Sequence, residues 1–290
     1  MDERGRLPDF VIIGAMKSAT TSLYRWLGEQ PEVFVPRAKE TRYFSDLWDR
    51  GQDWYEDRFA EAIDGQLLGE ASVSYTNPEF LPDAAERMSE VVPEARLIYA
   101  VRDPVQRLRS HYRFEVQRRR ESRPLLEALR EPHNLYLGRS MYFRCLVPYL
   151  ERFPQERILV VRFEDLVRAP NPGWPAVLSF LSLPDRPLPE TAFNVSAEKG
   201  QWTRAWVWAK DKRLISLRTV SRMPKPVRRL GRKVFARRGE AYDATLEASR
   251  VPIPEDLIAP VWDDVAKLEA WVGTPLWPGG GARIHSEAAP

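Results

Sequence analysis

The pattern of apolar runs along the chain most constrains its fold. Residues 10–14 and 96–101 form two runs that are apolar except for Arg96. Such runs are typical of parallel strands whose two faces are both covered by helices. Strand-like patterns also occur at residues 31–35, 67–71 and 157–163, and helix-like patterns separate or follow the strands at residues 22–27, 78–92, 104–120, 140–153, 174–181 and 257–272. This alternation predicts an α/β fold: a single domain with a central, mostly parallel sheet flanked by helices.

The chain of 290 residues has the apolar and charged fractions of an ordinary globular protein, which argues against a disordered or fibrous class. We expect one domain over residues 1–277, with a basic, loop-rich excursion at residues 183–241 and a disordered tail at residues 278–290. Residues 199–238 carry fourteen lysines or arginines and one acidic residue, although the net charge of the whole chain is only +3. This segment either faces an anionic ligand or surface or forms a solvated basic loop.

The first predicted strand is followed by a run of small and hydroxylated residues, Gly-Ala-Met-Lys-Ser-Ala-Thr-Thr-Ser at residues 14–22, and then by a helix. In such a loop, backbone N–H groups and the helix N-terminus converge on an anion, and Lys17 adds a positive charge. The loop is similar to a phosphate-binding loop but is not a Walker A sequence, because Val11 and Met16 stand where that pattern needs glycines. A capped helix with an incidental lysine is the alternative.

A second group of polar residues follows the strand at residues 96–101. Arg102 stands at the carboxyl end of this strand, where open α/β sheets bind ligands. Ser110 lies two turns along the helix that follows, and a guanidinium fork with a hydroxyl group can hold a phosphate. Arg107 and Arg109 would point elsewhere on that helix, and a solvated surface charge is the alternative interpretation of each.

The two motifs together resemble those of sulfotransferases that use 3′-phosphoadenosine-5′-phosphosulfate (PAPS). Residues 17–21 are similar to the loop of that family that binds the 5′-phosphosulfate. The 3′-phosphate motif of the family is matched by Arg102-Asp103-Pro104 with Arg107, Ser110 and Tyr112. The resemblance continues through residues 138–153, residues 157–165 and the pair Lys199-Gly200, and it covers most of residues 9–275.

This resemblance implies a role for each matched residue, with PAPS as co-substrate and no metal. Lys17 would stabilise the leaving oxygen, and Arg102 and Ser110 would hold the 3′-phosphate. Lys199 and Gly200 would close over the nucleotide. The 5′-phosphate would be cradled by the loop residues Ser18, Ala19, Thr20, Thr21 and Ser22.

Residues 39–44, Lys-Glu-Thr-Arg-Tyr-Phe, make the chain resemble the carbohydrate-modifying branch of the family (heparan-sulfate-type enzymes and their bacterial relatives) more than the small-phenol branch. In that branch a glutamate in a Lys-Glu-x-x-x-Phe context is the general base, and Glu40 matches it. A carboxylate within hydrogen-bond reach can take the proton of an acceptor hydroxyl as its oxygen attacks sulfur. Taken alone, a Lys-Glu pair is common on protein surfaces.

One departure from this branch concerns the strand at residues 67–71. Some members have a lysine directly after the glutamate that corresponds to Glu70, and Ala71 stands there instead. No lysine from this strand can then assist the base. We expect Glu70 to orient the site and the acceptor pocket to be lined by Ser72, Ser74 and Tyr75.

The implied reaction is sulfuryl transfer from PAPS to an acceptor hydroxyl on a sugar or a glycosylated small molecule, and an amine acceptor also fits. An ATP-dependent P-loop kinase is one alternative, but the Walker A spacing is missing. A nucleic-acid-binding protein is another, using the basic residues 199–238, which contain no recognisable base-reading motif. His111 lies inside the 3′-phosphate helix, away from the histidine base of phenol-type enzymes, and is not expected to be catalytic.

The remaining features concern compartment and packing. Cys145 is the only cysteine, and its apolar surroundings favour a buried structural thiol. The apolar run at residues 10–16 is too short for a membrane span and lacks a signal-peptide layout, so we expect a cytoplasmic protein with no membrane span. Three tryptophans either stack on a ligand ring or pack beneath a loop: Trp202, Trp206 and Trp208.

Overall fold

The computed structural model describes residues 6–189, 201–202, 236–237 and 251–278. Five parallel strands form one sheet in the order β2-β3-β1-β4-β5. Their bounds are β1 Phe10–Gly14, β2 Val33–Phe34, β3 Leu67–Ala71, β4 Arg96–Val101 and β5 Ile158–Arg162. The central parallel sheet predicted from the sequence is confirmed, and each of these strands ends within two residues of its expected bounds.

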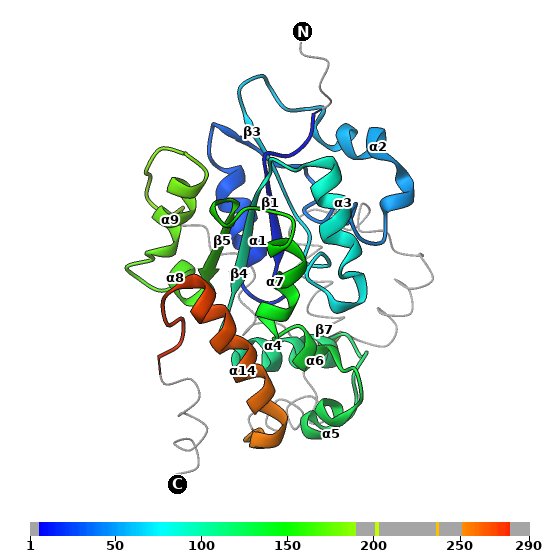
Figure 1. Ribbon diagram of the computed structural model, residues 1–290. Helices are drawn as coiled ribbons and strands as arrows, with labels where there is room; N and C mark the ends of the chain where they lie inside the picture. The colour runs from blue at the N-terminus through cyan, green and yellow to red at the C-terminus, as the bar shows by residue number, and fades with distance from the viewer. Residues whose placement is uncertain (1–5, 190–200, 203–235, 238–250, 279–290) are drawn as a thin grey trace.

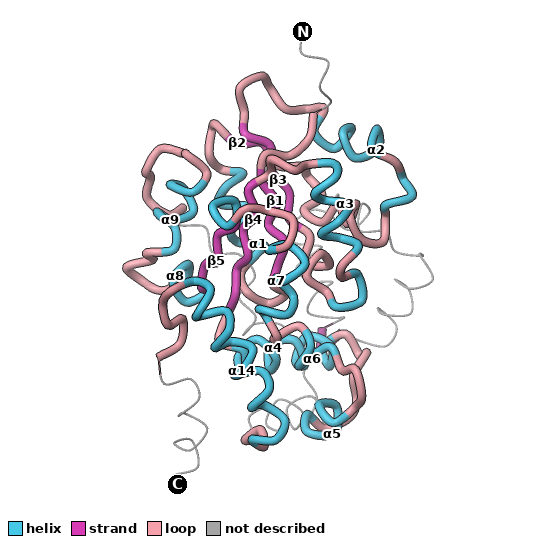
Figure 2. Tube along the Cα trace, viewed as in Figure 1, coloured by secondary structure: helices cyan, strands magenta, loops and turns pink. Residues whose placement is uncertain are grey.

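Helices cover both faces of the sheet (Figures 1 and 2). Side chains alternate between the faces because a strand has a period of two residues. Val11 and Ile13 therefore pack in one core and Phe10 and Ile12 in the other. The first core includes α3 (Asp83–Val91), α7 (Tyr142–Leu150) and α14 (Glu255–Val272), and the second includes α1 (Thr20–Gly28) and α9 (Gly173–Phe180). This double coverage explains why β1, the middle strand of the sheet, is apolar throughout.

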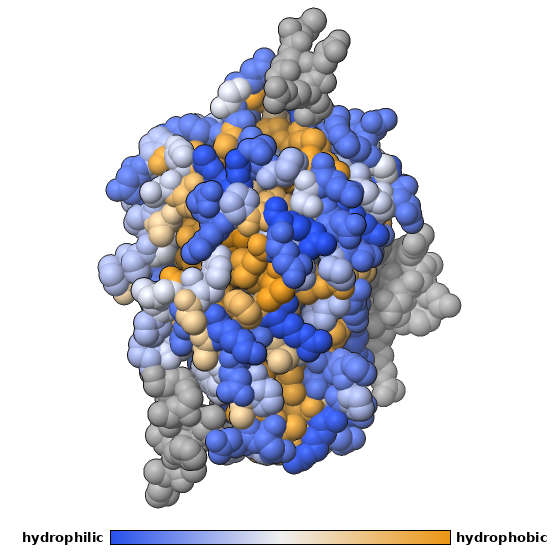
Figure 3. Space-filling view, in the orientation of Figure 1, coloured by the Kyte–Doolittle hydropathy of each residue, from blue (hydrophilic) through white to orange (hydrophobic). Residues whose placement is uncertain are grey.

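A third apolar cluster lies beyond the carboxyl ends of the strands, at the lower end of the view in Figure 1. It joins α4 (Pro104–Gln117), α5 (Leu125–Arg130) and α6 (Leu135–Gly138) to the first half of α14. Figure 3 shows the same side of the molecule, with hydrophobic residues over its middle and hydrophilic residues around them. The carboxyl edge of the sheet is thus enclosed by a helical layer built mainly around α4.

Some expected elements differ in their bounds. The helix expected at residues 78–92 is divided into a 3₁₀ turn, η3 (Pro78–Phe80), and α3, because Leu81 is extended and Pro82 follows it. Seven short elements were not expected from the sequence, since three to six residues carry little periodicity: η1 (Trp48–Arg50), α2 (Gln52–Glu56), η2 (Asp57–Phe59), α5, α6, η4 (Gln155–Arg157) and α8 (Phe163–Val167).

Most of the expected basic excursion at residues 183–241, and nearly all of the expected tail at residues 278–290, lie outside the described residues. From the excursion, the two short strands β6 (Gln201–Trp202) and β7 (Ala236–Arg237) pair in antiparallel fashion. Within the described part of the chain, no helix is both long and apolar enough to cross a membrane. Cys145 is buried on α7 as expected, and burial raises the pKa of its thiol to about 12.

Candidate active site

The loop after β1 occupies the centre of the carboxyl edge, because β1 lies between β3 and β4. Lys17 and Ala19 have positive φ angles of 75° and 61°, and α1 begins directly afterwards at Thr20. Turns that include left-handed residues can aim successive N–H groups at one point. The Ser18 side chain is fully buried, and its hydroxyl has no hydrogen-bond partner among the described residues. An unpaired buried hydroxyl is costly, so this loop fits an anionic ligand.

Close packing at the end of β1 positions this loop. A Cβ atom added to Gly14 would lie 2.1 Å from Oγ1 of Thr76 and 3.0 Å from the ring of Tyr99. The Thr76 hydroxyl itself donates to the carbonyl oxygen of Ile13 at 3.1 Å. Glycine at position 14 therefore allows the segment after β3 to approach the strand end.

Arg102 is brought to the same loop by β4. Its Nη1 donates to the carbonyl oxygen of Lys17 at 3.5 Å, and its guanidinium lies 4.3 Å from the ring centroid of Phe163. The Tyr142 hydroxyl donates to the carbonyl oxygen of Arg102 at 2.7 Å. Burial lowers the pKa of Arg102, and its Nε has no partner among the described residues. The guanidinium is thus held in place with one donor available for an anion.

Helix α4 places an aromatic ring beside the lysine of the loop. The Lys17 Nζ lies 4.4 Å from the ring centroid of Phe114, and the Arg118 guanidinium lies 4.2 Å from the same centroid. Phe114 is one helical turn beyond Ser110, which is buried on the same helix. The sequence interpretation did not single out Phe114 or Arg118, although the helical spacing of four residues from Ser110 could have indicated Phe114.

The structure excludes the alternative in which Arg107 is a solvated surface charge. Its side chain is fully buried, where Nε donates to Oγ of Ser140 at 2.7 Å and Nη2 donates to the carbonyl oxygen of Tyr136. The inner side of α4 carries this residue into the helical layer, where one hydroxyl and one backbone carbonyl accept in place of water and Nη1 has no partner among the described residues. Arg109 is partly buried and donates to the carbonyl oxygen of Val251 at 3.1 Å.

His111 is only 3% exposed, and its Nδ1 has no partner among the described residues. Its Nε2 lies 3.4 Å from Nη1 of Arg139 and 3.8 Å from a carboxylate oxygen of Glu115. Burial first, and then the positive charges of Arg107, Arg139 and Lys17, hold the pKa of His111 well below its usual value. The imidazole is therefore neutral near pH 7 and enclosed by protein.

Glu40 lies just beyond the carboxyl end of β3, the neighbour of β1. Its Oε1 forms an ion pair of 2.7 Å with Nζ of Lys39, and its Oε2 accepts the N–H of Val73 at 3.4 Å. The Glu40 side chain remains 36% exposed. The carboxylate is thus at the same edge of the sheet as Lys17 and Arg102, and it is open to an acceptor.

Glu70, on β3, is fully buried and accepts hydrogen bonds from four hydroxyl groups, those of Thr41, Tyr55, Ser72 and Tyr75. The expectation that Ser72 and Tyr75 line an acceptor pocket is wrong, because both are fully buried and turned to this carboxylate. Ser74 is partly buried and shares a hydrogen bond of 2.8 Å with the hydroxyl of Ser45.

Other expected site residues are not tested by the structure. Lys199, Gly200, Trp206 and Trp208 lie outside the described residues, and only the backbone of Trp202 is described, in β6. Among the residues that the structure describes, no group of three or more His, Cys, Asp or Glu side chains could hold a metal ion.

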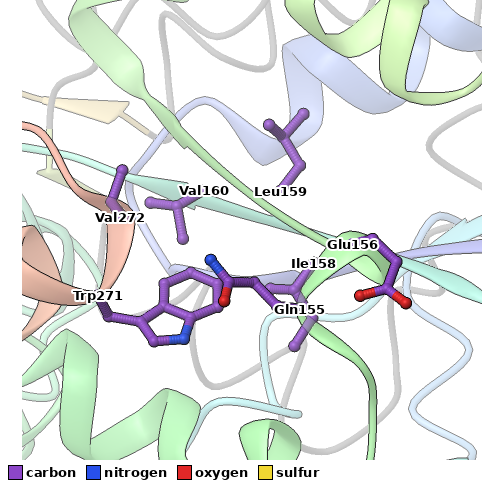
Figure 4. Close-up of a pocket in the computed structure, with 7 residues that line it drawn as sticks. All are labelled: Gln155, Glu156, Ile158, Leu159, Val160, Trp271 and Val272. Carbon is purple, nitrogen blue, oxygen red and sulfur yellow. The ribbon is translucent and has the colours of Figure 1, made fainter.

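A pocket of about 500 Å³ lies elsewhere, between the start of β5 and the end of α14 (Figure 4). Its lining includes Ile158, Val160 and Trp271. Ile158 pairs with Leu97, near the amino end of β4. The pocket contains none of the expected site residues, so it is not the candidate active site.

Comparisons with known proteins indicate the family of the chain. A family model described as the sulfotransferase family matches residues 76–187. Heparan sulfate glucosamine 3-O-sulfotransferase 3B1 of Homo sapiens is 30% identical over 206 residues, which are 67% of this chain and 51% of that protein. The membrane-associated sulfotransferase kil1 of Dictyostelium discoideum is 38% identical over 124 residues, which are 41% of this chain and 26% of that protein. The chain spans about half the length, or less, of these relatives.

Two solved structures share the fold. A sulfotransferase from Alicyclobacillus acidocaldarius matches with a TM-score of 0.65 at 24% identity and covers 93% of this chain and 97% of its own. The sulfotransferase domain from the curacin biosynthetic pathway matches with a TM-score of 0.51 at 16% identity and covers 91% and 98%. The sequence resemblance to sulfotransferases is thus confirmed, and the chain belongs to the sulfotransferase family.

Proposed function

We propose that the chain transfers a sulfuryl group from PAPS to an acceptor hydroxyl on a sugar or a glycosylated small molecule, with release of 3′,5′-adenosine bisphosphate. The observation that carries this proposal is the fully buried, unpaired hydroxyl of Ser18 in the loop beside Lys17. The available Nε of Arg102 lies at the same edge of the sheet. The heparan sulfate enzymes among the relatives support a sugar acceptor.

The residues of this edge fit the nucleotide part of PAPS. Ser18 and the backbone of the loop would hold the 5′-phosphate, and Arg102 with Ser110 would hold the 3′-phosphate. When bound, PAPS supplies a sulfuryl group on a phosphate leaving group. The Lys17 ammonium stabilises negative charge on the leaving oxygen. Lys199 and Gly200 are proposed to close over the nucleotide.

Glu40 is proposed as the general base. Its carboxylate is partly exposed, and the N–H of Val73 and the Lys39 ammonium hold it at the carboxyl edge of the sheet. A carboxylate in this position takes the proton of an acceptor hydroxyl as the oxygen attacks sulfur.

The test measures sulfuryl transfer from PAPS to a panel of glycosylated acceptors, with mass spectrometry to identify the product. Glu40→Gln keeps the size of the side chain but cannot accept a proton. We expect turnover to fall roughly 10²–10⁴-fold while the affinity for 3′,5′-adenosine bisphosphate stays unchanged.

Glu61→Gln is the matched control, because Glu61 is also an exposed glutamate in an ion pair, with Arg37. This variant should keep full turnover. Full turnover by Glu40→Gln would exclude Glu40 as the base. Absence of transfer by the unmodified chain to every acceptor, together with no binding of the bisphosphate, would refute the proposed function.

A further inference from the structure

Glu70 presents a physical problem, because a carboxylate with no exposed surface loses its hydration. Burying an unpaired carboxylate costs several kcal/mol, and such groups persist only when hydrogen bonds satisfy them. Burial raises the pKa of Glu70, and the hydrogen bonds of Thr41, Tyr75, Tyr55 and Ser72 act in the opposite direction. Four hydroxyl donors surround this one buried carboxylate, and such an arrangement indicates that the carboxylate has a role in the structure or in the site.

The two oxygens of Glu70 divide these donors into two pairs. Oε2 accepts the hydroxyl of Thr41 at 2.5 Å and that of Ser72 at 3.1 Å. Oε1 accepts the hydroxyl of Tyr75 at 2.7 Å and that of Tyr55 at 3.0 Å. Ser72 and Tyr75 come from the segment after β3 and Thr41 from the segment of Glu40, whereas Tyr55 comes from α2.

The Oε2 pair leads directly to Glu40. Thr41 follows Glu40 in the chain, and Ser72 precedes Val73, whose N–H donates to the Glu40 carboxylate. The two segments are also joined by the N–H of Arg42, which donates to Oγ of Ser72 at 3.0 Å. Oε2 of Glu70 thus joins residues 40–42 to residues 72–73, the two segments that hold the Glu40 carboxylate.

The Oε1 pair connects to the aromatic core. Tyr55, on α2, stacks on the ring of Tyr43 with centroids 4.3 Å apart. The Tyr75 hydroxyl lies 3.0 Å from Oγ1 of Thr41 and also accepts the N–H of Phe44 at 3.4 Å. Among the described residues, the Tyr55 hydroxyl contacts Glu70 and no residue of the segment around Glu40. Tyr55 is therefore the donor that can be removed without touching that segment.

We propose that Glu70 is a positioning residue for sulfuryl transfer, and that it sets the place of the Glu40 carboxylate through the hydroxyl groups of Thr41 and Ser72. This inference rests on the proposed function, in which Glu40 is the base. A carboxylate suits the role because both of its oxygens accept, whereas an amide would place donors against one pair of hydroxyl groups.

The test compares two variants that each remove one hydroxyl donor from Glu70. Thr41→Val keeps the branched shape of the side chain and removes the donor to Oε2, and Tyr55→Phe keeps the ring and removes a donor to Oε1. We expect Thr41→Val to lower kcat about 10- to 100-fold, as a displaced catalytic group would, with the KM for PAPS unchanged. Tyr55→Phe should keep kcat within about twofold of wild type, because the lost hydrogen bond is remote from Glu40.

Thr41→Ser should restore most of the lost kcat, since it returns the hydroxyl. Ser72→Ala removes the other Oε2 donor and should lower kcat in the same way, so the test stands even where Thr41→Val is poorly folded. Thermal unfolding of each variant separates lost stability from lost turnover. Equal losses of kcat in Thr41→Val and Tyr55→Phe, or no loss in either Oε2 variant, would overturn the inference.

The Glu40→Gln variant distinguishes a failure of the positioning role of Glu70 from a failure of the proposed role of Glu40 as the base. In a Glu40→Gln background, Thr41→Val should cause no further loss of kcat, because residues that act as one unit are not additive. If Glu40→Gln is inactive and Thr41→Val is normal, only the positioning role fails. If Glu40→Gln turns over normally, the assignment of the base fails and the positioning role with it.

Discussion

Phe114 lies beside the Lys17 ammonium and is not one of the residues that carry the family resemblance. Its ring stands beside the Lys17 ammonium, at 4.4 Å, and the Arg118 guanidinium, at 4.2 Å. An aromatic face attracts cations with about 0.5–2 kcal/mol, and an aliphatic side chain of similar size does not. Phe114 therefore helps to set where the Lys17 charge lies before transfer begins.

Phe114→Leu removes this attraction and keeps apolar bulk. We expect kcat to fall about 2- to 10-fold, corresponding to a loss of about 0.4–1.4 kcal/mol, with little change in the affinity for 3′,5′-adenosine bisphosphate. Phe114→Tyr keeps the ring face and is the control in the same steady-state assay. Identical kcat values for the two variants would show that the ring has no part in positioning Lys17.

For single residues, the sequence predicts the position of side chains that follow strand ends better than the position of side chains that depend on partners distant in the chain. Lys17 and Arg102 could be placed at one edge of the sheet because parallel strands end together. The burial of Arg107 could not be predicted, because its acceptors come from Tyr136 and Ser140, about 30 positions later in the chain. The sequence indicated that Glu70 orients the site, but its hydroxyl partners could not be predicted, since Tyr55 and Thr41 reach it from separate segments.

Helix α7 shows how elements far apart in the chain stabilise one another. Its N-cap residue, Met141, provides no side-chain cap. Asp264 on α14 supplies that cap, because its carboxylate accepts the N–H groups of Phe143 at 2.8 Å and Arg144 at 2.9 Å. Helix α7 also carries Tyr142, whose hydroxyl holds the backbone of Arg102, so this cap supports the nucleotide side of the site.

Asp264→Ala leaves two backbone donors at the start of α7 without their acceptor. We expect the free energy of unfolding in urea to fall by about 1–2 kcal/mol, the usual cost of losing a cap. Asp264→Asn keeps one acceptor oxygen and should lose less. Asp263→Ala, at the exposed neighbouring position, is the control and should be near neutral. An Asp264→Ala protein as stable as wild type would exclude the capping role.

Elements were predictable where a period extends over several residues. β3 and β4 have the bounds that their apolar runs indicate, and α14 begins within two residues of its expected start. The helix expected at residues 78–92 was wrong at its start, because Pro82 interrupts a pattern that otherwise favours a helix. The cap from Asp264 could not be predicted, since it acts across 120 positions of the chain.

In the whole molecule, the sheet is enclosed on three sides: apolar cores cover both faces, and the helical layer around α4 covers the carboxyl edge. The site therefore lies between the sheet and this layer. Positive side chains from both gather there, among them Lys17, Arg107 and Arg139. Burying these charges together with a neutral imidazole makes the stability of the fold dependent on pH.

His111 provides the test of this dependence. Burial, and then the charges of Arg107, Arg139 and Lys17, hold its pKa in the folded state well below the usual histidine value of about 6.5. Below that pH the unfolded chain binds a proton at this position and the folded chain does not. The contribution of His111 to stability is therefore fully present above pH 6.5 and is lost as the pH falls, by up to about 1.4 kcal/mol per pH unit.

His111→Asn has no titrating group and should lose this part of the pH dependence. We expect the free energy of unfolding in urea, measured between about pH 5 and pH 7.5, to decrease more steeply with falling pH for wild type than for the variant. The other titrating groups are the same in both proteins. A His111→Asn slope equal to wild type would mean that the folded protein accepts a proton on His111 despite the surrounding arginines. The positive side chains at the carboxyl edge would then be less enclosed than their burial indicates.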